Sequence, residues 1–80
     1  MKVTLKLSRV TMNMEEATIT AWAVPLGGAF HKGEPLYSIE TEKVSMDVDA
    51  PCNGALLEIL VAAGNEAAVG DAVCTIEMRG

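Results

Sequence analysis

The sequence predicts an all-β fold, a sandwich or barrel of short strands, and three observations support that prediction. Several segments alternate apolar and polar residues or are rich in β-branched side chains. Turn residues, mostly glycine and proline, separate these segments at short intervals. No segment of helical length keeps a 3.6-residue period, because the best candidate, residues 56–63, is short and lies between Gly54 and Gly64.

Six strands are expected from alternation or β-propensity, and their bounds are residues 3–7, 18–24, 35–39, 45–49, 55–61 and 72–77. Residues 11–16 are less regular, and Met12 and Met14 are expected to share one face of a short strand and fill the core. Residues 30–34 are expected to form a connector. Leu36 and Ile39 lie three positions apart, so the pattern predicts a β-bulge or a strong local twist there.

The length and composition fit one small domain, residues 1–80, with a core over about residues 3–77. So short a chain buries only a little more than ~60% of its unfolded surface, which argues against a deep pocket and a self-sufficient enzyme. Half of the residues are apolar but only three are aromatic, so the core is expected to be aliphatic. The net charge of −5 argues against nucleic acid and anionic membranes and fits positively charged partners.

The cysteines and the N-terminal sequence indicate a reducing compartment. Cys52 and Cys74 show no metal-binding spacing, and the single His31 cannot complete a metal site. Nothing resembles a signal peptide, and no apolar run approaches the ~18 residues of a membrane helix. We therefore expect two reduced thiols in a cytoplasmic protein of a bacterium, with an organelle matrix as the alternative.

A shift of 37 residues aligns the sequence with itself. Residues 24–40 and 61–77 are identical at five of seventeen positions, and both pairs of turn glycines are among them. Two equivalent halves in one small domain predict a twofold axis between them. The same shift maps Lys43 onto position 80 and onto position 6, so we expect Lys43 at one pole and both chain ends at the other.

Lys43 lies between two expected strands, at the tip of a hairpin with acidic neighbours. A lysine in that place is either a solvated surface residue or an attachment point. A hairpin tip exposes the amine, leaves its stem flexible and fixes its backbone, which suits attachment. A domain tethered at one pole and carrying a group at the other has the shape of a carrier.

Residues 40–44 read Glu-Thr-Glu-Lys-Val, and residues 46–51 read Met-Asp-Val-Asp-Ala-Pro. This pattern resembles the lipoyl domains of 2-oxo acid dehydrogenase complexes, which have Glu-Thr-Asp-Lys-Ala and then Met-Glu-Val-Glu-Ala-Pro. The likeness runs from about residue 3 to residue 76 and includes Trp22. Ala17 stands where the family often has glycine, which is acceptable only if the backbone there keeps a negative φ.

The resemblance implies a flattened barrel of two four-stranded antiparallel sheets related by a twofold axis, with lipoic acid joined to Lys43 by an amide. It implies that the lipoylating enzyme reads Glu40 and Gly27, while Glu42 and Val44 take the places of Asp and Ala beside the lysine. The implied partners are the lipoylating enzyme, a thiamine-diphosphate-dependent decarboxylase, an acyltransferase catalytic domain and a flavin dihydrolipoyl dehydrogenase. The domain, expected to be monomeric, would catalyse nothing itself and would shuttle acyl groups and electrons as a swinging arm.

Two other functions stay open at this point. One is a biotin carrier of the same fold, although those carriers resemble one another in a Met-Lys-Met tip and here the flanks are Glu42 and Val44. The other is an interaction module whose Lys43 is never modified. A conventional enzyme finds no support, because neither Cys52 nor His31 has a partner base in the sequence pattern. This sequence does not identify the 2-oxo acid or acetoin-type substrate, because the decarboxylase would select it.

Overall fold

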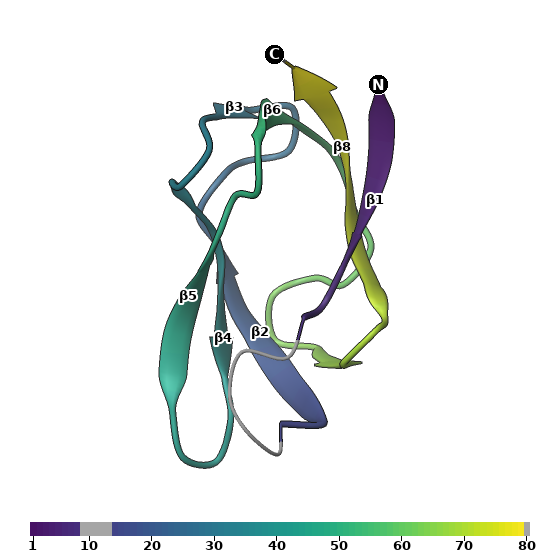
Figure 1. Cartoon of the computed structure of the whole chain (residues 1–80). Coiled ribbons are helices and arrows are strands. Elements are labelled where there is room, and N and C mark those ends of the chain that lie inside the picture. The colour runs from purple at the N-terminus through teal and green to yellow at the C-terminus, as the bar shows by residue number, and fades with distance from the viewer. Residues whose placement is uncertain (9–13, 80) are drawn as a thin grey trace.

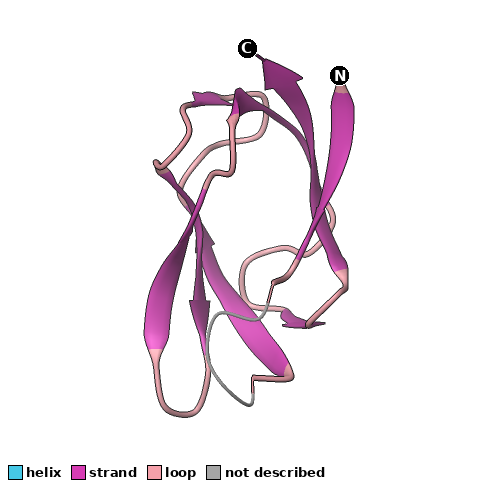
Figure 2. Cartoon of the chain, in the orientation of Figure 1, coloured by secondary structure: helices cyan, strands magenta, loops and turns pink. Residues whose placement is uncertain are grey.

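The computed structural model describes residues 1–8 and 14–79, and all regular structure in those ranges is strand (Figure 2). The strands are β1 (Lys2–Lys6), β2 (Glu16–Trp22), β3 (Ala29–Phe30), β4 (Pro35–Glu40), β5 (Ser45–Asp49), β6 (Asn53–Ile59), β7 (Glu66–Ala68) and β8 (Ala72–Arg79). They form two four-stranded antiparallel sheets with the orders β1-β8-β6-β3 and β5-β4-β2-β7 (Figure 1). The described residues include no helix that could cross a membrane.

The predicted all-β fold of two four-stranded antiparallel sheets is confirmed. Within the described residues the two sheets pack as a sandwich and do not join into a closed barrel. The short strands β3 and β7 were not expected: residues 29–30 pair with β6 and residues 66–68 pair with β2. Strands of two and three residues are too short to show a period of two, which is why residues 30–34 read as a connector. Met14 is buried but lies outside any strand, and Met12 lies outside the described residues.

The internal repeat is confirmed by the backbone. Exchanging β1, β2, β3 and β4 with β5, β6, β7 and β8 converts one sheet order into the other. Four of the described glycines have positive φ, and they form two pairs 37 residues apart: Gly27 (84°) with Gly64 (93°), and Gly33 (88°) with Gly70 (95°). The hydrogen bonds repeat as well. The Gly27 N–H donates to the Leu56 carbonyl at 2.7 Å, and the Gly64 N–H donates to the Ile19 carbonyl at 2.6 Å.

One part of the predicted repeat was wrong. The shift is 37 between β2–β4 and β6–β8, but it is 43 between β1 and β5. The Leu7 N–H donates to the Asp71 carbonyl at 2.9 Å, and the matching bond joins the Ala50 N–H to the Glu34 carbonyl at 2.7 Å. The first half therefore has six more residues between its first two strands than the second half has. This extra segment was invisible to a single fixed shift.

The corrected shift still places Lys43 opposite the chain ends, because it makes Met1 the equivalent of Val44, the residue after Lys43, and no longer makes Lys6 the equivalent of Lys43. The Thr41 N–H donates to the Val44 carbonyl at 2.8 Å, and the twofold-equivalent bond joins the Met78 N–H to the Met1 carbonyl at 2.7 Å. Figure 1 shows the β4–β5 turn at one end of the molecule and both termini at the other. The molecule is elongated, with extents of 34 × 20 × 19 Å.

The β-bulge predicted near Leu36 is present, because the register between β4 and β5 shifts between Pro35 and Tyr37. The shift turns two successive side chains inward, and Leu36 and Tyr37 are both buried. The equivalent pair in the second half is Val73 and Cys74, which are also both buried. These four residues, with Ile39 and Ile76, lie in a core that is otherwise mostly aliphatic.

The core contains one ionisable pair related by the twofold shift, Tyr37 and Cys74. Burial raises the pKa of Tyr37 to about 12, and the neighbouring Cys74 thiolate adds to that shift. Burial also raises the pKa of Cys74 to about 11. The ring of Trp22 packs on Tyr37 with centroids 4.9 Å apart, and its Nε1–H donates to the Val61 carbonyl at 3.0 Å. Because both pKa values are raised, the Tyr37 hydroxyl and the Cys74 thiol are neutral in the folded protein at pH 7.

Alkaline pH is expected to destabilise the fold, and Tyr37→Phe is expected to reduce that effect. When folding raises the pKa of an acid, the folded state keeps its full free energy of unfolding at any pH below the pKa of the unfolded state. That contribution is lost as pH rises from the unfolded-state pKa to the folded-state pKa. For Tyr37 that window runs from 10 to about 12. At pH 11 the variant should keep about 1 kcal/mol more of its neutral-pH stability than the unaltered chain does. Urea unfolding from pH 7 to 11 measures this, and equal losses in both chains would contradict it.

Candidate functional site

Lys43 lies in the turn between β4 and β5, and the sequence builds that turn locally. Glu40 is the last residue of β4, and it pairs with Ser45, the first residue of β5. The four residues between them reverse the chain, with the Thr41 N–H donating to the Val44 carbonyl at 2.8 Å. Glu40 also pairs with Thr18 of β2, so the base of the turn is held from both sides of β4. The lysine is thus displayed by a hairpin that is anchored in a sheet.

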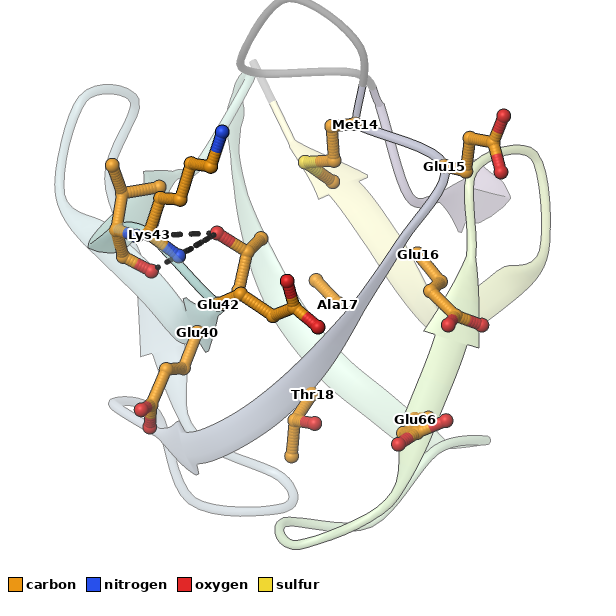
Figure 3. A pocket seen from close by; sticks show the side chains of 11 residues that line it. Met14, Glu15, Glu16, Ala17, Thr18, Glu40, Glu42, Lys43 and Glu66 are labelled. Atoms are coloured by element: carbon orange, nitrogen blue, oxygen red, sulfur yellow. Dashed lines mark hydrogen bonds between the residues drawn. The ribbon is translucent and has the colours of Figure 1, made fainter.

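The Thr41 side chain adds a second set of hydrogen bonds to the turn. Its Oγ1 accepts from the Val44 N–H at 3.2 Å and from the Lys43 N–H at 3.4 Å (Figure 3). The same hydroxyl lies 3.4 Å from the Val44 carbonyl oxygen, to which it can donate. Serine and threonine hydroxyls stabilise turns in this way when they sit at the first turn position. The backbone of Lys43 is therefore fixed while its side chain is left outside these contacts.

The Lys43 amine is exposed and has no partner among the residues that the structure describes. Across residues 1–8 and 14–79 its Nζ makes no hydrogen bond, and the one salt bridge in those ranges joins His31 to Glu34 at 3.0 Å. Figure 3 shows the amine directed away from the carboxylates of Glu40 and Glu42. An unpaired amine on a flexible stem is free to reach a partner's active site, because no contact has to break first.

An open groove of about 680 Å³ runs beside the lysine. Its lining residues come from the start of β2, from the β4–β5 turn and from β7, and they are Met14, Glu15, Glu16, Ala17, Thr18, Glu40, Thr41, Glu42, Lys43, Val44 and Glu66. Met14 and Ala17 are buried at its floor, whereas all five glutamates are exposed around it (Figure 3). Five carboxylates beside one ammonium give this end of the molecule a negative potential.

The structure brings most of the expected site residues together. Glu40, Glu42 and Val44 flank Lys43 in the same turn, and all of them are exposed. Gly27 lies elsewhere, in the connection from β2 to β3, and Figure 1 shows β3 near the termini. Its positive φ and its hydrogen bond to Leu56 give it a structural role there. Recognition of Glu40 and Gly27 by a lipoylating enzyme stays a prediction.

Sequence reasoning missed Thr41 and three groove carboxylates, those of Glu15, Glu16 and Glu66. Thr41 could have been found from its position, because a threonine at the first position of a four-residue turn often forms hydrogen bonds from its hydroxyl to the backbone of that turn. Glu16 and Glu66 lie fifty residues apart in the chain, and the pairing of β2 with β7 brings their strands together. β7 was not predicted, so nothing in the sequence pattern placed Glu66 near the lysine.

The described residues contain no group of three His, Cys, Asp or Glu side chains arranged to hold a metal ion. His31 Nδ1 contacts Glu34 in a surface turn, and that contact lowers the pKa of the Glu34 carboxyl through hydrogen bonds from the His31 backbone and ring. Ala17, where a glycine is common in the family, lies within strand β2 and pairs with Ala67 in extended backbone, as its side chain requires.

Comparison with known proteins identifies related sequences over nearly the whole chain. A family described as Biotin-requiring enzyme matches residues 3–76. The acetyltransferase component of the acetoin cleaving system of Bacillus subtilis is 34% identical over 76 residues, covering 95% of this chain and 19% of that protein. The succinyltransferase component of the 2-oxoglutarate dehydrogenase complex of Rickettsia bellii is 43% identical over 61 residues, covering 76% of this chain and 15% of that protein. This chain therefore spans less than a fifth of the length of these relatives.

Solved structures agree with the sequence comparison. The lipoyl domain of the 2-oxoglutarate dehydrogenase complex from Azotobacter vinelandii superposes with a TM-score of 0.77 at 26% identity, covering 98% of this chain and 99% of that one. A single-chain, multi-domain long-chain acyl-CoA carboxylase gives a TM-score of 0.79 at 20% identity, covering 98% of this chain and 7% of that one. The second likeness concerns the fold alone.

Proposed function

This chain belongs to the biotin- and lipoyl-attachment family as a lipoyl carrier domain, and we propose that Lys43 is the residue that holds its lipoic acid. The observation that carries the proposal is the exposed amine, unpaired within residues 1–8 and 14–79, on a turn whose backbone is fixed by Thr41. The domain is a carrier within a larger catalytic system and does not catalyse a reaction by itself.

The residues around Lys43 fit a covalently attached acyl chain. Attachment requires only that Nζ be accessible, and the turn leaves it so. Lys43 would hold the lipoyl group through an amide bond to Nζ. In forming that bond from an activated lipoyl group the ammonium would give up two protons, and the activating group would leave with the electron pair of the bond that breaks. The product is neutral, so the five groove carboxylates lose their nearest positive charge.

When attached, the lipoyl group supplies a redox-active disulfide that carries acyl groups and electrons. The part of this chain is to hold the arm on a rigid tip and to bring it near successive active sites, which raises its effective concentration there. The proposed partners are the lipoylating enzyme, a thiamine-diphosphate-dependent decarboxylase, an acyltransferase catalytic domain and a dihydrolipoyl dehydrogenase. The domain acts as a monomer in a cytoplasmic setting where Cys52 and Cys74 remain thiols.

The acidic groove is proposed to guide the decarboxylase onto the lysine end. Replacing Glu16 and Glu66 together by glutamine is expected to lower kcat/KM for reductive acylation roughly 3- to 10-fold at low salt, because both charges line the same groove as Lys43. The loss should shrink at high salt, where exposed charges are screened.

The matched control replaces Glu58 and Glu77 by glutamine. Both are exposed strand residues of the other sheet, and the change in net charge is the same. This variant should keep its kcat/KM within about twofold. Equal losses in the two variants would mean that only the overall charge matters and that the groove has no special part.

Intact-mass and peptide mass spectrometry of the chain from cells with active lipoylation tests the attachment. The expected result is a lipoyl mass on the peptide that contains Lys43. A biotin mass, or capture by streptavidin, would replace lipoic acid with the other prosthetic group of the family. A chain without modification in such cells would overturn the proposal.

A further inference from the structure

The turn that displays Lys43 contains side-chain hydrogen bonds in addition to the backbone bond that closes it. The twofold-equivalent place shows this, because there Met78 takes the position of Thr41 and Met1 takes the position of Val44. There the backbone bond between the two strands is present at 2.7 Å, although neither methionine side chain offers a hydroxyl. The hydroxyl contacts of Thr41 are therefore an addition that belongs to the lysine end alone.

We propose that Thr41 is a positioning residue for acylation of Lys43, acting through the backbone of the turn. This inference rests on the proposed attachment at Lys43. Without the hydroxyl, the Lys43 and Val44 N–H groups would bond only to water, and the two central residues of the turn would be held by the single bond from Thr41 to the Val44 carbonyl. A β4–β5 turn with fewer hydrogen bonds would populate conformations in which Nζ does not reach the acylating enzyme.

The fraction of molecules in which the turn is ordered should determine the KM of the acylation reaction. A ligase that accepts only the ordered turn meets a substrate whose apparent affinity is reduced by the fraction of ordered turns. Thr41 does not touch the reacting atoms, so the chemical step is unchanged once the substrate is bound. Loss of the hydroxyl should therefore raise KM of the acceptor domain and leave kcat unchanged.

The test uses the unmodified 80-residue chain, lipoic acid, ATP and a lipoate–protein ligase. Thr41→Val keeps the branched shape without the hydroxyl, and its KM is expected to rise roughly 3- to 10-fold, the equivalent of a lost hydrogen bond of about 1 kcal/mol. Thr41→Ser restores the hydroxyl and is expected to return KM to within about twofold of the unaltered chain. Ser45→Ala is the control, because that exposed hydroxyl next to the turn makes no hydrogen bond in the described part of the chain.

A second readout needs no enzyme. Amide ¹⁵N relaxation of the unmodified chain should show order parameters of roughly 0.85 at Lys43 and Val44, falling toward 0.6 in Thr41→Val and recovering in Thr41→Ser. Unchanged order parameters in Thr41→Val, a lower kcat at constant KM, or a failure of serine to rescue would each overturn the inference. The proposed attachment fails differently, since then the unaltered chain itself would not be acylated at Lys43.

Discussion

A chain with Lys43→Arg is expected to take up no lipoyl group, in cells or with purified ligase. Arginine keeps the positive charge and the length of the side chain, so the acidic groove beside it is little changed. Its guanidinium stays protonated at any physiological pH and does not attack an activated carbonyl. Reductive acylation of the variant should therefore be absent rather than reduced, as measured by intact mass and by transfer of a labelled acyl group.

Lys32→Arg is the matched control for this substitution. Lys32 is also an exposed lysine in a turn, and its backbone N–H donates to Asn53 Oδ1 at 2.8 Å. Figure 1 shows the connection from β3 to β4, which contains it, away from the β4–β5 turn. The control chain should be modified to the same extent as the unaltered chain. A lipoyl mass that survives Lys43→Arg and disappears with Lys32→Arg would move the attachment point to the other turn.

Much of this site could be predicted from sequence because its signals are local. Strict alternation over residues 45–49 defined β5, and the turn that precedes it had to display Lys43. The repeated glycines revealed the twofold relation, since positive φ at a turn restricts the residue type strongly. The twofold relation then predicted that Lys43 and the two chain ends lie at opposite ends of the domain, without any tertiary information.

The groove could not be predicted, because it depends on pairing between distant segments. β7 has three residues and no period, yet its pairing with β2 places Glu66 on the rim beside Glu16. The extra residues in the first half also escaped detection, since a repeat search with one shift assumes equal spacing. Gly27 lies in the β2–β3 connection and its N–H donates to the Leu56 carbonyl, so its recognition by a lipoylating enzyme stays a prediction.

Gly54→Ala is expected to be the most destabilising single-methyl change in the described part of the chain. Gly54 is buried in β6, and a Cβ there would collide with the Glu77 carbonyl oxygen and lie 3.2 Å from Phe30 Cζ. The cause is close approach rather than unusual backbone angles. Overpacking against a fixed backbone atom should cost about 3 kcal/mol, which lowers Tm by roughly 12–20 °C in a domain of this size. Thermal unfolding followed by circular dichroism measures the change.

The twofold shift supplies both the control and a compensating change for Gly54→Ala. The equivalent of Gly54 is Ala17 and the equivalent of Phe30 is Ala67, so one half packs Gly against Phe where the other packs Ala against Ala. Ala17→Gly should therefore cost only about 1 kcal/mol, since it removes one methyl group and adds backbone freedom. Phe30→Ala alone should cost about 3–5 kcal/mol, but combined with Gly54→Ala it should cost less than the sum, because the Phe30 ring no longer opposes the new methyl. Strict additivity would show that the Glu77 carbonyl alone requires glycine at position 54.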